Sequence, residues 1–282
     1  MTTQKPSTPL AVVVAFLTVG TALAQSPSGP QPSPMQIVKN VIYNEMHPSA
    51  VNNVYWRYRL EKTSGSRQET RTVIETKSGS IDRLTAVAGQ PLSGAQAANE
   101  TKRILRFSHN PDEQRKAEEA RRKDAEQCNT FLKMIPDAFV FEYAEQNANA
   151  IKLKFKPNPH FQPPSREGKV LQQMAGEMWV DARQQRLISI SGQLMNDVKF
   201  GGGLLGHLEK GGRFIVKRVE IAPGDWELTD LTVNMQGKAL LFKNIAVQQK
   251  EVHSNFERMP DEITMADAVN VLVRHTLIAS TR

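Results

Sequence analysis

The sequence has a single cysteine, few aromatic residues and no long run of one charge. Cys128 cannot form a disulfide bond within the chain, so the folded state must be stabilised by a hydrophobic core. Cys128 precedes Phe131 and Leu132 in a predicted helix, which favours a buried, inert thiol; a nucleophile is the alternative. Aromatic residues make up 6% of the chain and the basic residues are interspersed with acids, so nucleic-acid binding is not expected.

Local signatures of catalysis, metal binding and cofactor binding are also missing. The six histidines are far apart in the sequence, without the spacing of a zinc site, and no Gly-x-Ser-x-Gly motif is present. Residues 201–206 formally match the Gly-x-Gly-x-x-Gly fingerprint, but the next predicted strand begins at Arg213, too soon for the required long helix. We therefore interpret residues 201–212 as a wide turn and predict no catalytic residue, metal or cofactor. An enzyme is the less favoured class.

The N-terminus has the pattern of a cleavable export signal. Lys5 precedes an apolar run over residues 10–23, and small residues at Ala22 and Ala24 lie before Gln25. We predict a signal peptide over residues 1–24 and a disordered leader rich in proline and serine over residues 25–34. No cysteine near the cleavage point could accept a lipid anchor, so the sequence predicts a protein released into the periplasm or secreted. Cleavage removes one lysine and no acid, which lowers the formal charge from +7 to +6.

Most of the remaining chain has the alternation of β-strands. Val54, Trp56, Tyr58 and Leu60 alternate with polar or amphipathic residues, as in a half-buried strand. Because the connections are short, the strands should form a large antiparallel sheet. The other predicted strands are 69–77, 80–88, 102–107, 138–145, 150–156, 175–181, 186–195, 213–221, 226–235 and 239–250.

Three helices are predicted around this sheet. Residues 35–46 carry one apolar stripe, and Thr264 and Asp267 form a capping box that opens a helix over 264–278. Asn110 and Pro111 open a charged helix that ends near residue 135 and should be mostly solvated. The predicted fold is an α+β domain over residues 35–282.

The sequence between residues 157 and 258 resembles a known family. It contains Pro157-Asn158-Pro159, the strand Gly176-Glu177-Met178-Trp179-Val180-Asp181, Gly192, and Asp197 to Gly201. These features resemble a family of secreted bacterial proteins of unsettled function, related in fold to the LolA/LolB-like superfamily of lipoprotein carriers and receptors. The resemblance implies an antiparallel sheet curled as an incomplete (half) barrel around helices, with an apolar cavity for acyl chains. Residues 35–156 share only this architecture.

Two non-enzymatic functions follow as hypotheses. Several strands are apolar on both faces, as in Phe214, Ile215 and Val216, which fits either a cavity or a packed core. The first hypothesis is a carrier or sensor that binds a lipid, acyl chain or lipoprotein cargo in the half barrel and contacts membranes only transiently. The second is an envelope protein that binds a protein partner through the charged helix. The predicted cavity-lining residues, chosen for size and strand position, are Trp56, Tyr58, Phe155, Trp179, Phe214, Trp226 and Phe242.

Overall fold

The structure is a computed structural model that describes residues 31–47, 54–203, 206–239 and 243–279. The chain divides into residues 1–32 and residues 33–282, and every helix and strand below belongs to the second unit. The predicted signal peptide, most of the predicted leader and the predicted site residue Phe242 lie outside the described residues.

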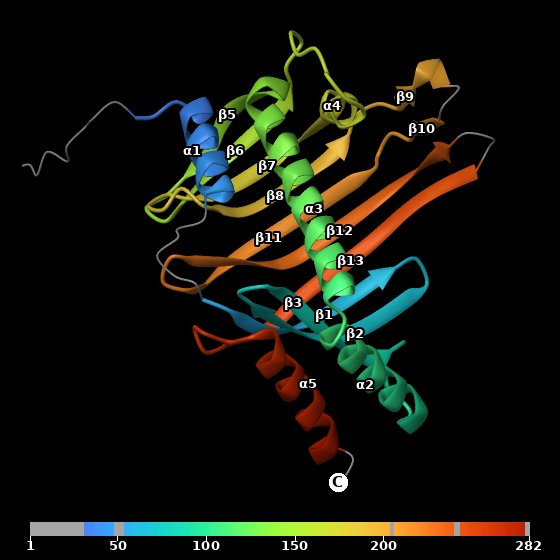
Figure 1. Cartoon of the computed structure of the whole chain (residues 1–282). Coiled ribbons are helices and arrows are strands. Elements are labelled where there is room, and N and C mark those ends of the chain that lie inside the picture. Colours follow the sequence, from blue (N-terminus) through green and yellow to red (C-terminus); the bar gives the residue numbers. More distant parts are fainter. Residues whose placement is uncertain (1–30, 48–53, 204–205, 240–242, 280–282) are drawn as a thin grey trace, which may run out of the picture. The chain divides into compact units, whose positions relative to one another are not determined.

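A thirteen-stranded antiparallel sheet dominates the fold (Figure 1). Its main path runs in the order β4-β3-β2-β1-β13-β12-β11-β8-β7-β6-β5, and β9 and β10 attach beside β12. The two edge strands β4 and β5 do not pair, so the sheet is open rather than a closed barrel. The prediction of a large antiparallel sheet in an α+β fold is confirmed. The strands are β1 (Trp56–Ser64), β2 (Arg67–Thr76), β3 (Gly79–Val87), β4 (Gln90–Pro91), β5 (Phe139–Gln146), β6 (Ala150–Pro157), β7 (Met174–Asp181), β8 (Leu187–Leu194), β9 (Val198–Phe200), β10 (Gly206–Leu208), β11 (Arg213–Ala222), β12 (Asp225–Ala239) and β13 (Lys243–Arg258).

The three predicted helices are present. They are α1 (Pro34–Met46), α3 (Pro111–Ala138) and α5 (Met265–Ala279). The predicted caps form as well: Asn110 accepts the first free backbone N–H groups of α3, and Thr264 and Asp267 bond each other's backbone N–H groups at the start of α5.

Two helices were not predicted, and one replaces a predicted strand. Residues 102–107 belong to α2 (Gly94–Ser108), so the strand prediction there is wrong. Ser93 and Gln96 form a complete capping box that starts this helix, and Ile104 is its buried apolar contact. The apparent alternation in Leu105-Arg106-Phe107 was too short to distinguish a strand from one turn of a helix. The other unpredicted helix is α4 (Arg166–Leu171).

The helices cover opposite faces of the sheet at its two ends. We call the face that carries Leu153 of β6 the inner face; α1 and the end of α3 pack against it over β5 to β8. On β2 and β3 the packed residues Ile74 and Ile81 point the other way, to the outer face, where α2 and α5 cover them with Ile104. The sheet therefore has two hydrophobic cores, one on each face.

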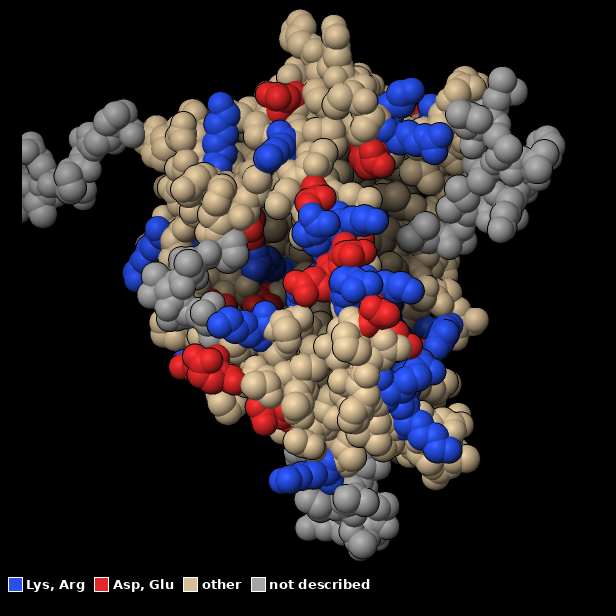
Figure 2. Space-filling model, in the orientation of Figure 1, with Lys and Arg blue, Asp and Glu red and all other residues tan. Residues whose placement is uncertain are grey.

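The sheet bends around α3. The guanidinium of Arg121 lies against Gly79 of β3, and α3 ends at Ala138, immediately before β5. Between these two points the helix rises about 26 Å, whereas nine strand spacings separate β3 from β5, roughly 43 Å along the sheet. Even with the length of the Arg121 side chain added, the helix is too short to follow a flat sheet, so the sheet bends; Figure 2 shows a hollow on the side that α3 crosses.

The middle of α3 is exposed, although its Arg121 guanidinium lies against Gly79 at the start of β3. Residues 115–128 are all exposed, as expected for the mixed charges of this segment. Cys128 is exposed with them, so the expectation of a buried thiol is wrong. The reason is that packing of α3 against α1, α4 and β5 is confined to its last turns, which begin beyond Cys128.

The glycine-rich segment is a turn only in part: the prediction of one wide turn over residues 201–212 is wrong for residues 206–208, which pair with β12 and β9 as a strand. Residues 201–203 make a single 3-10 turn after β9, and the following strand β10 begins at Gly206. Gly202 has φ of 66°, in the left-handed region that favours glycine. Because a strand follows, the geometry of a dinucleotide site is absent from the described part of this segment.

Candidate functional site

The register of the sheet aligns residues of seven neighbouring strands across its inner face. In antiparallel pairs, residues directly opposite each other point to the same side. One such row starts in the inner core, continues through apolar residues and ends in charged ones. In order across β7, β8, β11, β12, β13, β1 and β2 it consists of Met178, Ile190, Val216, Leu231, Glu251, Lys62 and Glu69.

The middle of the inner face is apolar but uncovered. Val216, Leu231, Val233 and Leu60, which we call the inner strip, are only partly buried. They pack against neither of the two core clusters that the described residues form. The inner strip is therefore apolar surface that the described helices leave accessible.

Phe214 joins the inner strip to the core. A second cross-strand row runs from Phe155 through Gly176 and Gly192 to Phe214. The Phe214 ring lies so close over Gly192 that a Cβ atom there would be 2.5 Å from it, and a Cβ on Gly176 would be 2.7 Å from the Phe155 ring. The two glycines thus make room for two aromatic rings on the inner face.

The charged middle of α3 crosses this side of the sheet. Figure 2 shows its mixed charges as a band of alternating colours, with the surface hollowed beside the band. Acidic and basic atoms are visible on the floor of that hollow (Figure 2). Charged groups and a hollow thus lie together on the side of the sheet that α3 crosses (Figure 2).

Acidic and aromatic residues occupy one end of the inner face. Trp56 donates from its ring nitrogen to Asp225 over 2.9 Å and from its backbone to Glu75 over 3.1 Å. Burial, together with the neighbouring carboxylates Glu75 and Asp225, raises the pKa of Glu227 to about 7. Burial also raises the pKa of Glu75. This end of the face therefore holds carboxylates that resist ionisation.

Tyr58 lies between these carboxylates and the inner strip. Its ring stacks on His253, with ring centroids 5.0 Å apart, and lies 5.4 Å from the centroid of Phe256. Burial and the charge of Glu75 raise the pKa of its hydroxyl, so Tyr58 stays a neutral hydrogen-bonding group at physiological pH.

An ion-pair cluster fixes the end of α1 beside this acidic end. Glu45 of α1 contacts Arg218 of β11, and its carboxylate lies 3.5 Å from Nε of Arg186. Arg186 also donates to the backbone carbonyl of Asn44. Burial lowers the pKa of both arginines, although neither approaches neutrality in solution near pH 7. The cluster holds α1 over β8 and β11.

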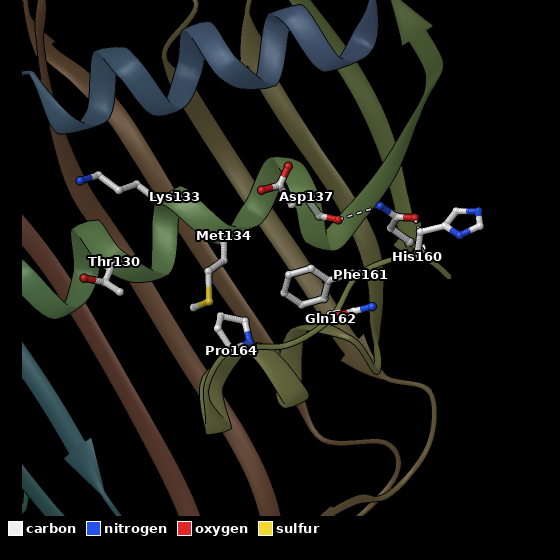
Figure 3. A pocket seen from close by; sticks show the side chains of 9 residues that line it. Thr130, Lys133, Met134, Asp137, His160, Phe161, Gln162 and Pro164 are labelled. Atoms are coloured by element: carbon white, nitrogen blue, oxygen red, sulfur yellow. Dashed lines mark hydrogen bonds between the residues drawn. The ribbon is translucent and has the colours of Figure 1, made fainter.

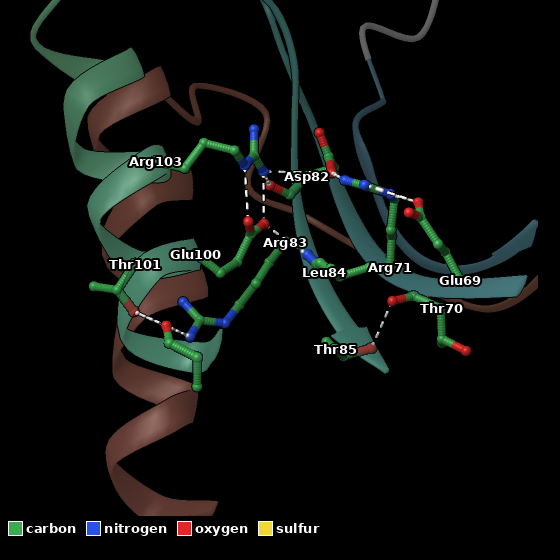
Figure 4. A network of polar contacts seen from close by, with 11 residues as sticks. Glu69, Thr70, Arg71, Asp82, Arg83, Leu84, Thr85, Glu100, Thr101 and Arg103 are labelled. Atoms are coloured by element: carbon green, nitrogen blue, oxygen red, sulfur yellow. Dashed lines mark hydrogen bonds and ion pairs between the residues drawn. The ribbon is translucent and has the colours of Figure 1, made fainter. Parts of the chain in front are cut away.

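Basic residues gather at the opposite end of the inner face. Lys62, Arg67 and Arg71 surround Glu69, whose carboxylate is 2.9 Å from Nη2 of Arg71 and also contacts Arg67. Figure 4 shows how this group continues through Asp82 to the edge of the sheet. There Arg103 and Glu100 of α2 join the network, and Glu100 accepts the backbone N–H of Leu84 over 2.8 Å.

The predicted cavity-lining residues do not form one wall. Trp56, Tyr58 and Trp226 lie at the acidic end, where the Trp226 ring nitrogen donates to Gln184. Phe155 is buried against Phe139 and Phe141, while Phe214 is partly accessible beside the inner strip. Trp179 follows Met178 in β7, so its side chain points to the outer face, where its ring stacks with Lys152 of β6. Phe242 lies outside the described residues.

Sequence reasoning missed the smaller aliphatic residues and the charges. The predicted set was chosen for aromatic size, so it omitted Leu60, Val216 and Leu231. A usable signal was present in β1, where Tyr58, Leu60 and Lys62 share one face by alternation and change from aromatic to apolar to basic. The acid Glu227 had no local signal, because its neighbours Glu75 and Asp225 are distant in sequence.

An open pocket of about 600 Å³ lies elsewhere, between the last turns of α3 and the loop before α4. Figure 3 shows Met134, Phe161 and Pro164 at its centre, with Lys133, Asp137 and His160 around them. The Asn158 side chain donates to the Asp137 carbonyl over 2.8 Å and closes one end. Two features make this pocket a weaker candidate than the inner face: it is open to solvent, and its few apolar atoms face no converging charges.

The described part of the chain contains no group of three or more His, Cys, Asp or Glu side chains that could hold a metal ion. None of its helices combines the length and the apolar composition needed to cross a membrane.

Comparisons with known proteins add little. No protein-family model matches the chain, and no curated protein matches it. One solved structure, the crystal structure of a DUF1329 family protein from Desulfovibrio piger, aligns with 84% of this chain and 98% of its own. The identity is 9% and the TM-score is 0.26, so the likeness supports no conclusion about fold or function.

Proposed function

We propose that this chain is an exported, non-enzymatic protein that binds an amphiphile, such as a lipid or the acyl chain of a lipoprotein, on its inner face. The observation that carries the proposal is the inner strip, an apolar surface on a concave face with charged groups at both ends. Exposed apolar surface lowers solubility and stability, and such surface in a concavity is typical of ligand sites. The fold is compatible with the half barrel that the sequence resemblance implies.

The direct test starts with protein purified without detergent. Native mass spectrometry should detect a bound amphiphile, and protein stripped of lipid should take up a fluorescent fatty acid. A preparation that carries no lipid and takes up none would overturn the proposal.

A matched pair of substitutions on β11 tests the location. Val216→Asp puts a charge into the inner strip, whereas Val219→Asp puts the same charge on the outer face, where Val219 is 50% exposed. Burial of a valine-sized apolar surface is worth about 1.5–3 kcal/mol. Val216→Asp should therefore weaken fatty-acid binding at least about tenfold, and Val219→Asp should leave it unchanged. Equal effects of the two substitutions would place the ligand elsewhere.

A second candidate function is a protein–protein contact through the middle of α3. The supporting observation is that every residue from 115 to 128 is exposed, so that, apart from the contact of Arg121 with Gly79, the helix offers a free surface without needing to unpack. Replacing Arg115, Glu119 and Arg122 with alanine preserves helix propensity and alters only that surface. A pull-down from the envelope fraction should then lose a protein that the unaltered chain captures. Unchanged capture would rule out this segment as the contact.

A further inference from the structure

The basic end of the inner face forms a defined pocket. It has a volume of about 390 Å³ and is lined by Lys62, Ser64, Arg67, Glu69 and Arg71. The five residues come from the facing ends of β1 and β2 and flank the turn that joins these strands. The pocket therefore belongs to a rigid hairpin rather than to a long loop.

The acids in and around this pocket are largely buried, and two of its three bases are accessible, whereas the third, Arg71, is 23% exposed. The Glu69 and Glu251 side chains are 9% and 14% exposed, whereas those of Lys62 and Arg67 are 42% and 72% exposed. Lys62 lies 2.7 Å from Glu251, and Arg71 lies 2.9 Å from Glu69. A ligand entering the pocket would thus meet ammonium and guanidinium groups, while the carboxylates below them hold those groups in place.

The carboxylates stay ionised, which keeps the bases fixed. Burial alone would raise the pKa of Glu69, but Arg71 and Arg67 lower it below its ordinary value. His253, 3.7 Å away, and Lys62 lower the pKa of Glu251 to about 2. Arg71 is held from its other side by Asp82, which Arg103 of α2 also approaches (Figure 4).

The composition of the pocket favours a phosphate group over a carboxylate. Arg67 is 72% exposed and contacts Glu69 through Nη2, so its other N–H groups can pair with phosphate oxygens, and Lys62 adds a point charge. Arg71 already donates Nε and Nη2 to Glu69 and Nη1 to Asp82, so it forms the wall of the pocket and adds positive charge there. A phosphomonoester carries a charge between about −1.5 and −2 near neutral pH, more than a carboxylate, and so gains more from the accessible cations Lys62 and Arg67, although Glu69 and Glu251 offset part of this attraction. The hydroxyl of Ser64 adds a hydrogen-bonding group at the rim.

The pocket adjoins the inner strip. Leu60 precedes Lys62 by two residues on the same face of β1, about 7 Å away. Across the sheet, Glu251 alone separates Lys62 from Leu231 in the row of paired residues. A phosphate in the pocket would therefore lie next to apolar surface.

We propose that the pocket formed by Lys62, Arg67 and Arg71 binds a phosphate group, and that an apolar chain attached to it lies along the inner strip. The location of the chain rests on the proposed function; the phosphate pocket stands on its own residues. The ligand class is an amphiphile with a phosphate head group, or a small soluble phosphate that uses the pocket alone.

The test is isothermal titration of the intact mature chain with octyl phosphate, glycerol 3-phosphate and 1-octanol. Octyl phosphate should bind at least about tenfold more tightly than 1-octanol, and rising salt should weaken only the phosphates. The variant Lys62→Gln/Arg67→Gln should lose that advantage and bind 1-octanol as before. The single variant Arg67→Gln keeps the ion pair between Arg71 and Glu69, so it tests the same loss of phosphate binding with a smaller effect on folding.

The control is Lys250→Gln/Arg213→Gln, which removes two exposed cations from the outer face of β13 and β11. It should bind all three compounds like the unaltered chain. Tight glycerol 3-phosphate binding without 1-octanol binding would support the pocket and count against the acyl site. The phosphate pocket is overturned if octyl phosphate binds no better than 1-octanol, or if the control variant loses as much affinity as Lys62→Gln/Arg67→Gln.

Discussion

At its two ends the sheet buries apolar residues on opposite faces. Over β5 to β8 the inner face is apolar, and α1 with the end of α3 covers it. Over β2 and β3 the inner face carries Glu69, Arg71 and Glu75 beside the buried Val73, and Ile74 and Ile81 point outward beneath α2 and α5. A sheet whose core changes face must have a middle in which neither core is complete. In this molecule the inner strip occupies that middle.

The comparison predicts unequal costs for truncating leucines at the two places. Leu153→Ala removes a fully buried side chain from the inner core and should lower the free energy of unfolding by about 2–5 kcal/mol. Leu60→Ala removes a partly exposed side chain of the inner strip and should cost less than about 1 kcal/mol. Urea unfolding of both variants measures the difference. Equal costs would mean that the strip is packed as tightly as the core.

The acidic end should make stability depend on pH through Glu227. Its pKa is raised from 4.5 to about 7, so ionisation is harder in the folded than in the unfolded chain. The folded state is therefore unaffected at low pH and loses stability as pH rises through about 4.5 to 7, by up to about 3 kcal/mol. Glu227→Gln should abolish this loss, so that the variant exceeds the unaltered chain in stability at pH 8.5 but matches it closely at pH 4.5. Urea unfolding of both proteins at the two pH values measures this difference. If the stability of the two proteins changed with pH in the same way, the loss would not come from Glu227.

The row of glycines that links the covered core to the open strip should tolerate no side chain at its centre. A Cβ on Gly176 would lie 2.0 Å from the backbone carbonyl oxygen of Ser191, which cannot move without distorting β8. Gly176→Ala should destabilise the chain by about 1–3 kcal/mol. Gly94→Ala, in open space at the start of α2, should be neutral or stabilise by up to about 1 kcal/mol. Thermal unfolding compares the two, and an innocuous Gly176→Ala would show that the row is loosely packed.

The smallest effect is expected on the exposed middle of α3. Arg122 and Glu126 form a solvent-exposed pair over 3.6 Å, one turn apart. Arg122→Ala should change the free energy of unfolding by less than about 0.5 kcal/mol. A larger loss in urea unfolding would show that this segment contributes to the fold beyond its own helix.

The sequence predicted most strands, but it did not predict which face of each strand a helix packs against. Alternation identifies two faces for β1 or β2, but it does not say which face a helix will cover, because that depends on contacts between distant segments. Ile74 and Val73 are equally apolar neighbours, yet Ile74 alone joins the outer core. For the same reason the sequence could not reveal that Glu227 meets Glu75 and Asp225, or that Cys128 is exposed. The capping box of Ser93 and Gln96 was readable and would have corrected the strand assigned to residues 102–107.

The central claim is that an apolar chain lies on the inner strip, and site-directed photolabelling tests it most directly. A fatty acid with a photoreactive diazirine at the end of its chain is bound to the protein, irradiated, and mapped by peptide mass spectrometry. The account predicts labels in peptides that contain Val216, Leu231 and Val233, displaced by excess unlabelled fatty acid. Labels confined to the pocket between α3 and α4, or labels that excess fatty acid does not displace, would contradict it.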